Sequence, residues 1–302
     1  MVRFNDIYIV GIDHGYGNLK TANIAVPSGV KVYDTEPPLT GGLLEYDGKY
    51  IRIGESHKAF TADKTSDMDN YYLTLYGIAR EFASAGITEG NVHLAVGLPL
   101  MWVSAQRGSF TEYLMRNESV KFTYNGRHYK VCITGVTVFP QSYCAVYDRL
   151  REMDGLNMIA DIGNGTMNIM KVSDHKVITD SCRTEKLGVE KCVIEIQNAI
   201  MNSFQTGIDE SIVTKFLIGK PVELPPEYAK VMQRCATEYC RNILDTLYKY
   251  DYNSQIMKLF VVGGGAVVMK NFSDIPPKSF FITDVCANAK GYEYLALRKL
   301  RR

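Results

Sequence analysis

One short pattern occurs twice in this 302-residue chain and constrains its fold more than any other feature. Residues 7–20 read IYIVGIDHGYGNLK and residues 158–170 read MIADIGNGTMNIM, so Asp-x-Gly-x-Gly recurs at an offset of 148 residues. In each copy an apolar run leads into the glycines and a second apolar run follows them, which predicts a β-hairpin with a glycine-rich tip. One repeat half a chain apart indicates two related domains, because a solenoid repeats about every 20–50 residues in at least three copies.

The rest of the chain fits two α/β halves. The hydrophobic patterns predict strands at 50–54, 91–98 and 256–262, and a hairpin over 119–139 that turns at Asn125-Gly126. They predict helices at 69–85, 103–117, 141–153, 188–203, 227–250 and 287–300. The helix at 141–153 would join the two halves, and the last helix would dock on the first domain.

Composition excludes several classes of protein. The chain has 34 Lys+Arg against 33 Asp+Glu, and this balance argues against a dedicated nucleic-acid binder, which would carry a basic excess. No apolar run reaches the roughly 20 residues that span a bilayer, and the N-terminus has no secretory pattern. The seven cysteines are scattered without C-x-x-C, so we expect reduced thiols, no zinc site and a cytoplasmic protein.

The glycine tips suggest an anion site. Glycine lets backbone N–H groups approach an anion closely, and an Asp at the strand end can hold Mg²⁺ through water. Two such hairpins, with Asp13 and Asp161 at their strand ends, would clamp a polyphosphate from both sides, and Lys20 would neutralise its charge. Each hairpin alone could equally be a tight turn. His14 is expected to be an exposed residue of the first tip.

A third element is Gly263-Gly264-Gly265, which follows the strand at 256–262. Three glycines would let the backbone pass flat against a base or ribose, although a tight strand-to-helix turn is the alternative. Two other nucleotide sites are excluded: the chain has no G-x-x-x-x-G-K-[ST], and the first hairpin lacks the third glycine of the dinucleotide fingerprint.

The motifs DHGYGNLK, VFPQSYCA, DIGNGTMN, VVGGGA and ANAKGYEYL stand in this order along the chain. Together they resemble the five nucleotide-pocket motifs of the actin, sugar kinase and heat-shock chaperone ATPase superfamily. The details are most similar to the bacterial actin-like ParM/StbA plasmid-segregation proteins, over about residues 7–297. The resemblance implies two ribonuclease-H-like α/β domains with a nucleotide cleft between them: residues 1–143 with 286–302, and residues 144–285.

The resemblance also implies a role for each matched residue. Asp13 would hold Mg²⁺ through water, and Asp161 could do the same from the second domain. Gln141 would orient the attacking water, although it could instead cap the helix expected after it. The remaining residues would line the nucleotide: Gly15, Tyr16, Gly17, Asn18 and Lys20 in the first loop; Gly163, Asn164, Gly165 and Thr166 in the second; and Gly188, Gly263, Gly264 and Gly265 near the base and ribose.

The function implied is that of a Mg-dependent ATPase (or GTPase) that assembles into dynamic filaments. Because the amide of Gln141 cannot act as a general base, hydrolysis should be slow and coupled to assembly. The resemblance implies plasmid DNA segregation, with DNA reached only through a small DNA-binding adaptor and no contact with a membrane. A sugar-type small-molecule kinase is the alternative, and a chaperone-like ATPase is a third class.

Overall fold

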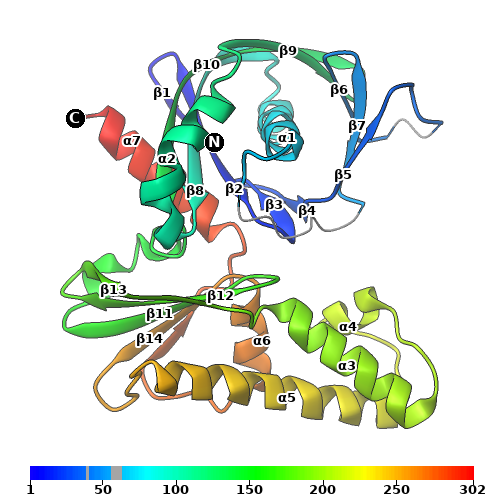
Figure 1. Ribbon diagram of the computed structural model, residues 1–302, viewed down its shortest axis with the longest axis vertical. Coiled ribbons are helices and arrows are strands. Elements are labelled where there is room, and N and C mark those ends of the chain that lie inside the picture. The colour runs from blue at the N-terminus through cyan, green and yellow to red at the C-terminus, as the bar shows by residue number, and fades with distance from the viewer. Residues whose placement is uncertain (39–40, 56–62) are drawn as a thin grey trace. The chain divides into compact units, whose positions relative to one another are not determined.

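Figure 1 shows the computed structural model of the chain, which describes residues 1–38, 41–55 and 63–302. The chain forms two compact units. Unit 1 comprises Met1–Tyr147 and Val285–Arg302, and unit 2 comprises Asp148–Asp284. Each unit has its own sheet and its own hydrophobic core. None of the helices in the described part of the chain is long and apolar enough to cross a membrane.

Unit 1 is built of ten strands, three α-helices and one 3₁₀ turn within its described residues. In chain order they are β1 (Val2–Phe4), β2 (Ile7–His14), β3 (Asn18–Lys20), β4 (Ala25–Pro27), β5 (Val30–Tyr33), β6 (Leu43–Tyr46), β7 (Lys49–Ile53), α1 (Asp69–Ser84), β8 (Glu89–Leu98), α2 (Leu100–Leu114), β9 (Ser119–Tyr124), β10 (Arg127–Pro140), η1 (Cys144–Val146) and α7 (Ala287–Leu300).

Unit 2 is smaller and is built on a single five-stranded sheet, with its α-helices in the connections between strands. Its elements are η2 (Leu150–Glu152), β11 (Leu156–Ile162), β12 (Met167–Ser173), β13 (Lys176–Glu185), α3 (Val189–Phe204), α4 (Glu210–Leu217), α5 (Pro226–Lys249), β14 (Lys258–Val262), α6 (Gly265–Phe272) and β15 (Ser279–Phe281).

The two sheets share one five-strand pattern. Unit 1 contains the order β4-β3-β2-β8-β10, and unit 2 has the order β13-β12-β11-β14-β15. In both series the first two pairings are antiparallel and the last two are parallel. This is the ribonuclease-H-like mixed sheet that the sequence predicts for each domain. Unit 1 extends it beyond β10 with β9, β6, β7 and β5.

The internal repeat is also visible in the packing of β2 and β11, the strands that lead into the two glycine hairpins. Val10 and Ile12 of β2 point into the core of unit 1, and Met158 and Ala160 of β11, at the offset of 148, point into the core of unit 2. Because side chains alternate along a strand, the Asp that follows each pair lies on the opposite face of its sheet. The two aspartates of the repeat therefore occupy equivalent faces.

Helices cover both faces of the central strands of unit 1. The sheet curls around α1, which packs against strands from β2 to β9 (Figure 1). On the other face α7 packs against β2 and β8 at close range. A Cβ atom at Gly11 would lie 2.1 Å from the carbonyl oxygen of Ala289, and one at Gly97 would lie 2.0 Å from the Tyr292 hydroxyl. The absence of side chains at these glycines therefore lets α7 pack closely on β2 and β8.

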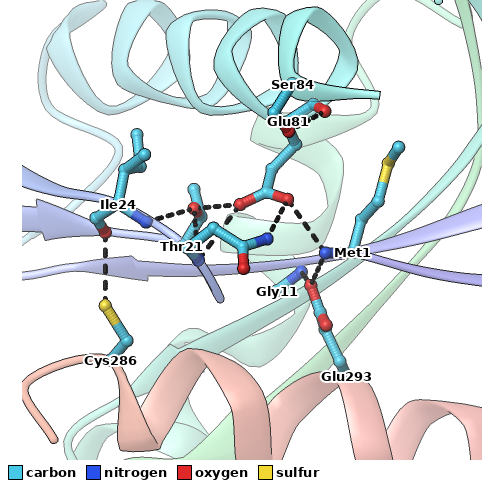
Figure 2. A network of polar contacts seen from close by, with 9 residues as sticks. Met1, Gly11, Thr21, Ile24, Glu81, Ser84, Cys286 and Glu293 are labelled. Atoms are coloured by element: carbon cyan, nitrogen blue, oxygen red, sulfur yellow. Dashed lines mark hydrogen bonds and ion pairs between the residues drawn. The ribbon is translucent and has the colours of Figure 1, made fainter. Parts of the chain in front are cut away.

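A buried polar network ties α1 and α7 to β2 (Figure 2). Glu81 of α1 accepts hydrogen bonds from the Thr21 hydroxyl, from Asn23 Nδ2 at 2.8 Å and from the Met1 amino group at 2.9 Å. Glu293 of α7 accepts from the backbone N–H of Gly11 at 2.9 Å and lies 3.2 Å from the same amino group. Burial of carboxylates is tolerated here because each one has several donors.

The predicted helix at 141–153 is wrong. The chain there forms turns and two short 3₁₀ segments, η1 and η2. Its backbone groups serve tertiary contacts instead of a helix: the N–H of Gln141 donates to Leu98 O at 2.8 Å, and that of Ser142 donates to Asn288 Oδ1 at 3.0 Å. Ser142 also has φ +69°, which an α-helix does not allow. The other predicted helices are present, with ends shifted by up to three residues.

Candidate functional site

The first glycine hairpin lies at the turn between β2 and β3. Asp13 pairs with Lys20 across the two strands, and His14 pairs with Leu19. The turn is tight, because a Cβ atom at Gly15 would lie 2.6 Å from the carbonyl oxygen of Asn18. Gly15, Tyr16 and Gly17 thus form the predicted tip, and Asn18 begins β3.

Asp13 is buried at the base of this hairpin and collects polar partners from two strand ends. Its Oδ2 lies 3.6 Å from Lys20 Nζ, and its Oδ1 accepts a hydrogen bond from Gln141 Nε2 at 2.9 Å. Gln141 directly follows β10, and its backbone N–H donates to Leu98 at the end of β8. The carboxyl ends of parallel strands are the usual place for ligands in open α/β sheets. Unit 1 therefore brings three of the predicted site residues into one cluster.

The orientation of the Gln141 amide follows from the chemistry of its partner. A carboxylate only accepts hydrogen bonds, so the amide must turn its NH₂ group toward Asp13. The amide oxygen then points away from Asp13 and can accept a hydrogen bond from another donor. Because no helix follows Gln141 directly, the alternative that it caps such a helix does not apply.

The second glycine hairpin, between β11 and β12, repeats the register of the first. Asp161 pairs with Asn168 and Ile162 with Met167, which are the positions of the first hairpin shifted by 148 residues. The turn closes with a hydrogen bond from Gly163 N–H to Thr166 O at 2.8 Å. Asp161 is buried, with 7% of its surface exposed. The repeat seen in the sequence is thus a repeat of strand pairing.

The N-terminus of α3 holds the back of the second hairpin. The backbone N–H of Val189 donates to Gly163 O at 3.0 Å, and that of Glu190 donates to Asn164 O at 2.9 Å. A Cβ atom at Gly188 would lie 2.0 Å from Asn164 O, so only glycine permits this approach. Gly188 therefore lies against the second hairpin, as a spacer between the tip and α3.

The three consecutive glycines after β14 are not equivalent. Gly263 has φ +82°, and a Cβ atom there would lie 2.6 Å from Ile162 O and 2.7 Å from Asp161 Oδ1. A Cβ atom at Gly265 would lie 2.2 Å from Ile162 Cγ2. Gly264 has an ordinary helical conformation and open space where a Cβ would stand. Two of these glycines are therefore needed for packing of α6 and β14 on β11, and only Gly264 has room for a ligand.

The predicted residues thus gather in two groups, one in each unit. Unit 1 groups Asp13, Lys20 and Gln141 with the first tip. Unit 2 groups Asp161, the second tip from Gly163 to Thr166, Gly188 and the glycines at 263–265. Across the described residues no three His, Cys, Asp or Glu side chains form a metal-binding cluster.

The prediction that His14 is exposed is wrong. The ring is buried, its Nε2 lies 2.8 Å from the Thr74 hydroxyl of α1, and its edge packs on Phe110 at 5.6 Å between ring centroids. As the last residue of β2, His14 points into the core of unit 1 because Asp13 points to the other face.

Two residues near the first tip were missed by the sequence analysis. Lys64 and Ser28 are both buried and donate hydrogen bonds to carbonyl groups of the tip. Neither belongs to a motif. Lys64 lies in a polar stretch shortly before the predicted helix at 69–85, as many surface residues do, and Ser28 lies between Pro27 and Gly29 with no predicted element beside it.

Comparison with known proteins agrees with this fold. Residues 11–143 match the family model for the N-terminal domain of actin-like proteins, and residues 159–274 match the model for the C-terminal domain of the archaeal actin homologue, MreB-like. No curated protein matches the chain by sequence.

Solved structures with the same fold include three of different origin. The archaeal actin homologue Ta0583 in complex with ADP is 19% identical, with TM-score 0.73 over 96% of this chain and 99% of that one. Bacillus thuringiensis ParM with ATP is 16% identical, with TM-score 0.72 over 99% and 100% of the two chains. The Alp12 filament structure is 16% identical, with TM-score 0.69 over 98% and 100%. With an actin-like domain model matched in each half and this fold over nearly its full length, the chain belongs to the actin-like proteins.

Proposed function

We propose that this protein is an actin-like ATPase that polymerises into nucleotide-dependent filaments. The observation that carries the proposal is the pair of glycine hairpins with identical register, each with a buried aspartate one residue before its strand ends. A tight turn needs glycine, but it does not need the same Asp at the same paired position in both units. The repeated arrangement is explained if each hairpin offers backbone N–H groups to phosphate.

Mg²⁺ is the metal that suits these residues. It keeps several waters and needs only one or two carboxylates, and Asp13 and Asp161 are buried carboxylates at equivalent positions of the two hairpins. Asp13 would hold it through water, and Asp161 is a second candidate for this role. Bound there, the ion would offset charge on the phosphates during transfer. Lys20, 3.6 Å from Asp13, would exchange this partner for a phosphate oxygen.

Gln141 is proposed to orient the attacking water. Its amide nitrogen donates to Asp13, and its amide oxygen is turned the other way, where it can accept a hydrogen bond from water. An amide does not take up a proton at neutral pH, so it aligns the water without activating it. We therefore expect slow hydrolysis that follows assembly, in contrast to a kinase, which would place a carboxylate base beside a substrate hydroxyl.

The cellular role that we propose is segregation of plasmid DNA in the cytoplasm, through a small DNA-binding adaptor. The support is the likeness to proteins named ParM and to the Alp12 filament. The near-neutral charge of the chain also favours an indirect link to DNA, because direct binders neutralise phosphates with an excess of Lys and Arg.

Right-angle light scattering with phosphate release recorded in the same cuvette tests the proposal. Mg-ATP and Mg-GTP are added separately to the purified protein, and EDTA serves as the metal-free control. We expect scattering to rise above a threshold protein concentration and to decay as phosphate appears. Absence of scattering at tens of micromolar protein, with phosphate transfer stimulated by a sugar, would place the protein with the small-molecule kinases instead.

A further inference from the structure

Three carbonyl groups of the first hairpin tip are held from behind by two buried residues. The ammonium group of Lys64 donates to His14 O, and the hydroxyl of Ser28 donates to Tyr16 O. The backbone N–H of Ser28 donates to Gly17 O at 3.1 Å. The exposed fraction is 2% for Lys64 and zero for Ser28. Three peptide groups of this turn are thus fixed, those whose carbonyls belong to His14, Tyr16 and Gly17.

The second tip is held in the same way by different donors. There the backbone N–H groups that begin α3 donate to Gly163 O and Asn164 O. At the offset of 148 residues, Asn164 is equivalent to Tyr16. The same carbonyl is therefore fixed in both tips, by a helix N-terminus in unit 2 and by the Ser28 hydroxyl in unit 1.

Holding a carbonyl group also sets the direction of the next N–H. In a planar trans peptide the C=O and the following N–H point in opposite directions. With the carbonyls of His14 and Tyr16 turned toward Lys64 and Ser28, the N–H groups of Gly15 and Gly17 point away from these donors. In the second tip the N–H groups of Asn164 and Gly165 are turned away from α3 by the same reasoning.

The α3 N-terminus behind the second tip and Lys64 behind the first both place positive charge beside their tip. A helix N-terminus carries about half a positive charge, which favours an anion beside the second tip. No helix of the described residues begins behind the first tip, because β4 is followed by β5 and α1 starts only at Asp69. Lys64 brings a full positive charge to that place, and its ammonium lies 5.2 Å from the centre of the Tyr16 ring.

We propose that Lys64 and Ser28 are positioning residues for phosphate binding by the first hairpin, in place of the helix N-terminus that serves the second. The proposal rests on the proposed nucleotide-binding function. The ligand it concerns is the polyphosphate group of a nucleoside triphosphate. Lys64 supplies charge and holds the peptide between His14 and Gly15, and Ser28 holds the two peptides whose carbonyls belong to Tyr16 and Gly17.

The test compares nucleotides that differ in phosphate number. The affinities of Lys64→Met and the unmodified protein for ATP, ADP and adenosine are measured by calorimetry with Mg²⁺ present. We expect Lys64→Met to lose roughly tenfold to a hundredfold in ATP affinity, the range for a hydrogen bond to a charged group. The loss should be smaller for ADP and absent for adenosine. A merely structural role would weaken all three ligands equally. Lys64→Arg, which keeps the charge, should recover part of the loss.

Lys258→Met is the matched control. Lys258 also donates its ammonium to a backbone carbonyl, that of Glu152, but it lies at the first residue of β14, at the opposite end of that strand from the glycines. Its substitution should leave the ATP affinity unchanged. Ser28→Ala removes the hydroxyl while keeping the backbone donor, and should weaken ATP binding roughly threefold to tenfold.

Each outcome of these measurements bears on one proposal. Folded Lys64→Met with the ATP affinity of the unmodified protein would overturn the positioning role. If Lys64→Met does not fold, Ser28→Ala decides, and unchanged ATP affinity in that variant would overturn the proposal as well. If the unmodified protein binds none of the three ligands, the nucleotide-binding function itself fails, which is a separate result.

Discussion

An alanine scan of the three glycines at 263–265 would separate packing from ligand binding at adjacent positions. At Gly263 the φ of +82° costs an alanine about 1–2 kcal/mol, because Cβ crowds the following carbonyl in this conformation. Contact of the new Cβ with Ile162 O at 2.6 Å and Asp161 Oδ1 at 2.7 Å adds an overpacking cost of about 1–3 kcal/mol. We therefore expect Gly263→Ala to lower the free energy of unfolding by about 3 kcal/mol.

The other two positions should respond differently. At Gly265 the Cβ would lie 2.2 Å from Ile162 Cγ2, at a cost of about 1–3 kcal/mol, but alanine gains up to about 1 kcal/mol in helix propensity at the start of α6. The net loss should be about 1–2 kcal/mol. At Gly264 there is open space and an ordinary helical conformation, so alanine should change the free energy of unfolding by less than about 0.5 kcal/mol.

Thermal unfolding followed by circular dichroism checks this order. A loss of about 3 kcal/mol corresponds to a fall of roughly 10 °C in Tm for a domain of the size of unit 2, to which these glycines belong. Trp102, the single tryptophan, lies in unit 1, so its fluorescence gives an independent record of that unit. The reasoning is refuted if Gly264→Ala is the least stable variant or if all three variants melt together. With stability unchanged, any fall in the ATP affinity of Gly264→Ala would report a ligand that approaches this backbone.

Three further predictions concern other parts of the molecule. The Gln141→Ala variant should bind ATP as before but release phosphate at a rate at least about tenfold lower. Unchanged hydrolysis would contradict the proposed role of the amide. Gly97→Ala should lower the free energy of unfolding by about 2–3 kcal/mol, because its Cβ would lie 2.0 Å from the Tyr292 hydroxyl, whereas Gly108→Ala, which meets open space, should not destabilise the protein in urea unfolding. Burial acts to raise the pKa of Glu81, but hydrogen bonds from Thr21 and the Met1 amino group outweigh it and hold this pKa below its ordinary 4.5. Glu81 therefore contributes stability above about pH 4.5 that is lost as the pH falls through its lowered pKa, and Glu81→Gln, less stable at pH 7, should show a shallower decline in acid unfolding.

The sequence predicted the parts of the fold that depend on local pattern. Both hairpins, the buried strand before the three glycines and most helices follow from hydrophobic periodicity and turn residues, which act over a few neighbours. The helix expected at 141–153 failed because its backbone N–H groups bond to Leu98 and Asn288, far away in the sequence. The prediction that His14 is exposed was wrong for a related reason. Its ring is buried by contacts with α1 and α2, which lie far from the hairpin in the sequence.

The candidate site likewise has a part that the sequence pattern predicts and a part that depends on distant contacts. The repeat points to the residues that we propose face a ligand, because a close approach to phosphate would restrict their type. It could not identify the residues that hold each tip from behind, since any donor at the right place would serve. In unit 2 that donor is the start of α3, which begins at Val189 after β13 ends at Glu185 and lies outside the repeated segment 158–170.

In unit 1 the equivalent strand, β4, ends at Pro27, and the chain runs through β5–β7 before α1 begins at Asp69. This insertion separates the first tip from any helix that could start directly behind it. Ser28, the first residue after β4, and Lys64, five residues before α1, lie at the two ends of the insertion and donate to the tip. If the repeat arose by duplication, the insertion would have removed the helix N-terminus from the first tip and left its carbonyls to be held by side chains. Replacing Lys64 therefore tests whether charge at this position is needed because the helix N-terminus is absent.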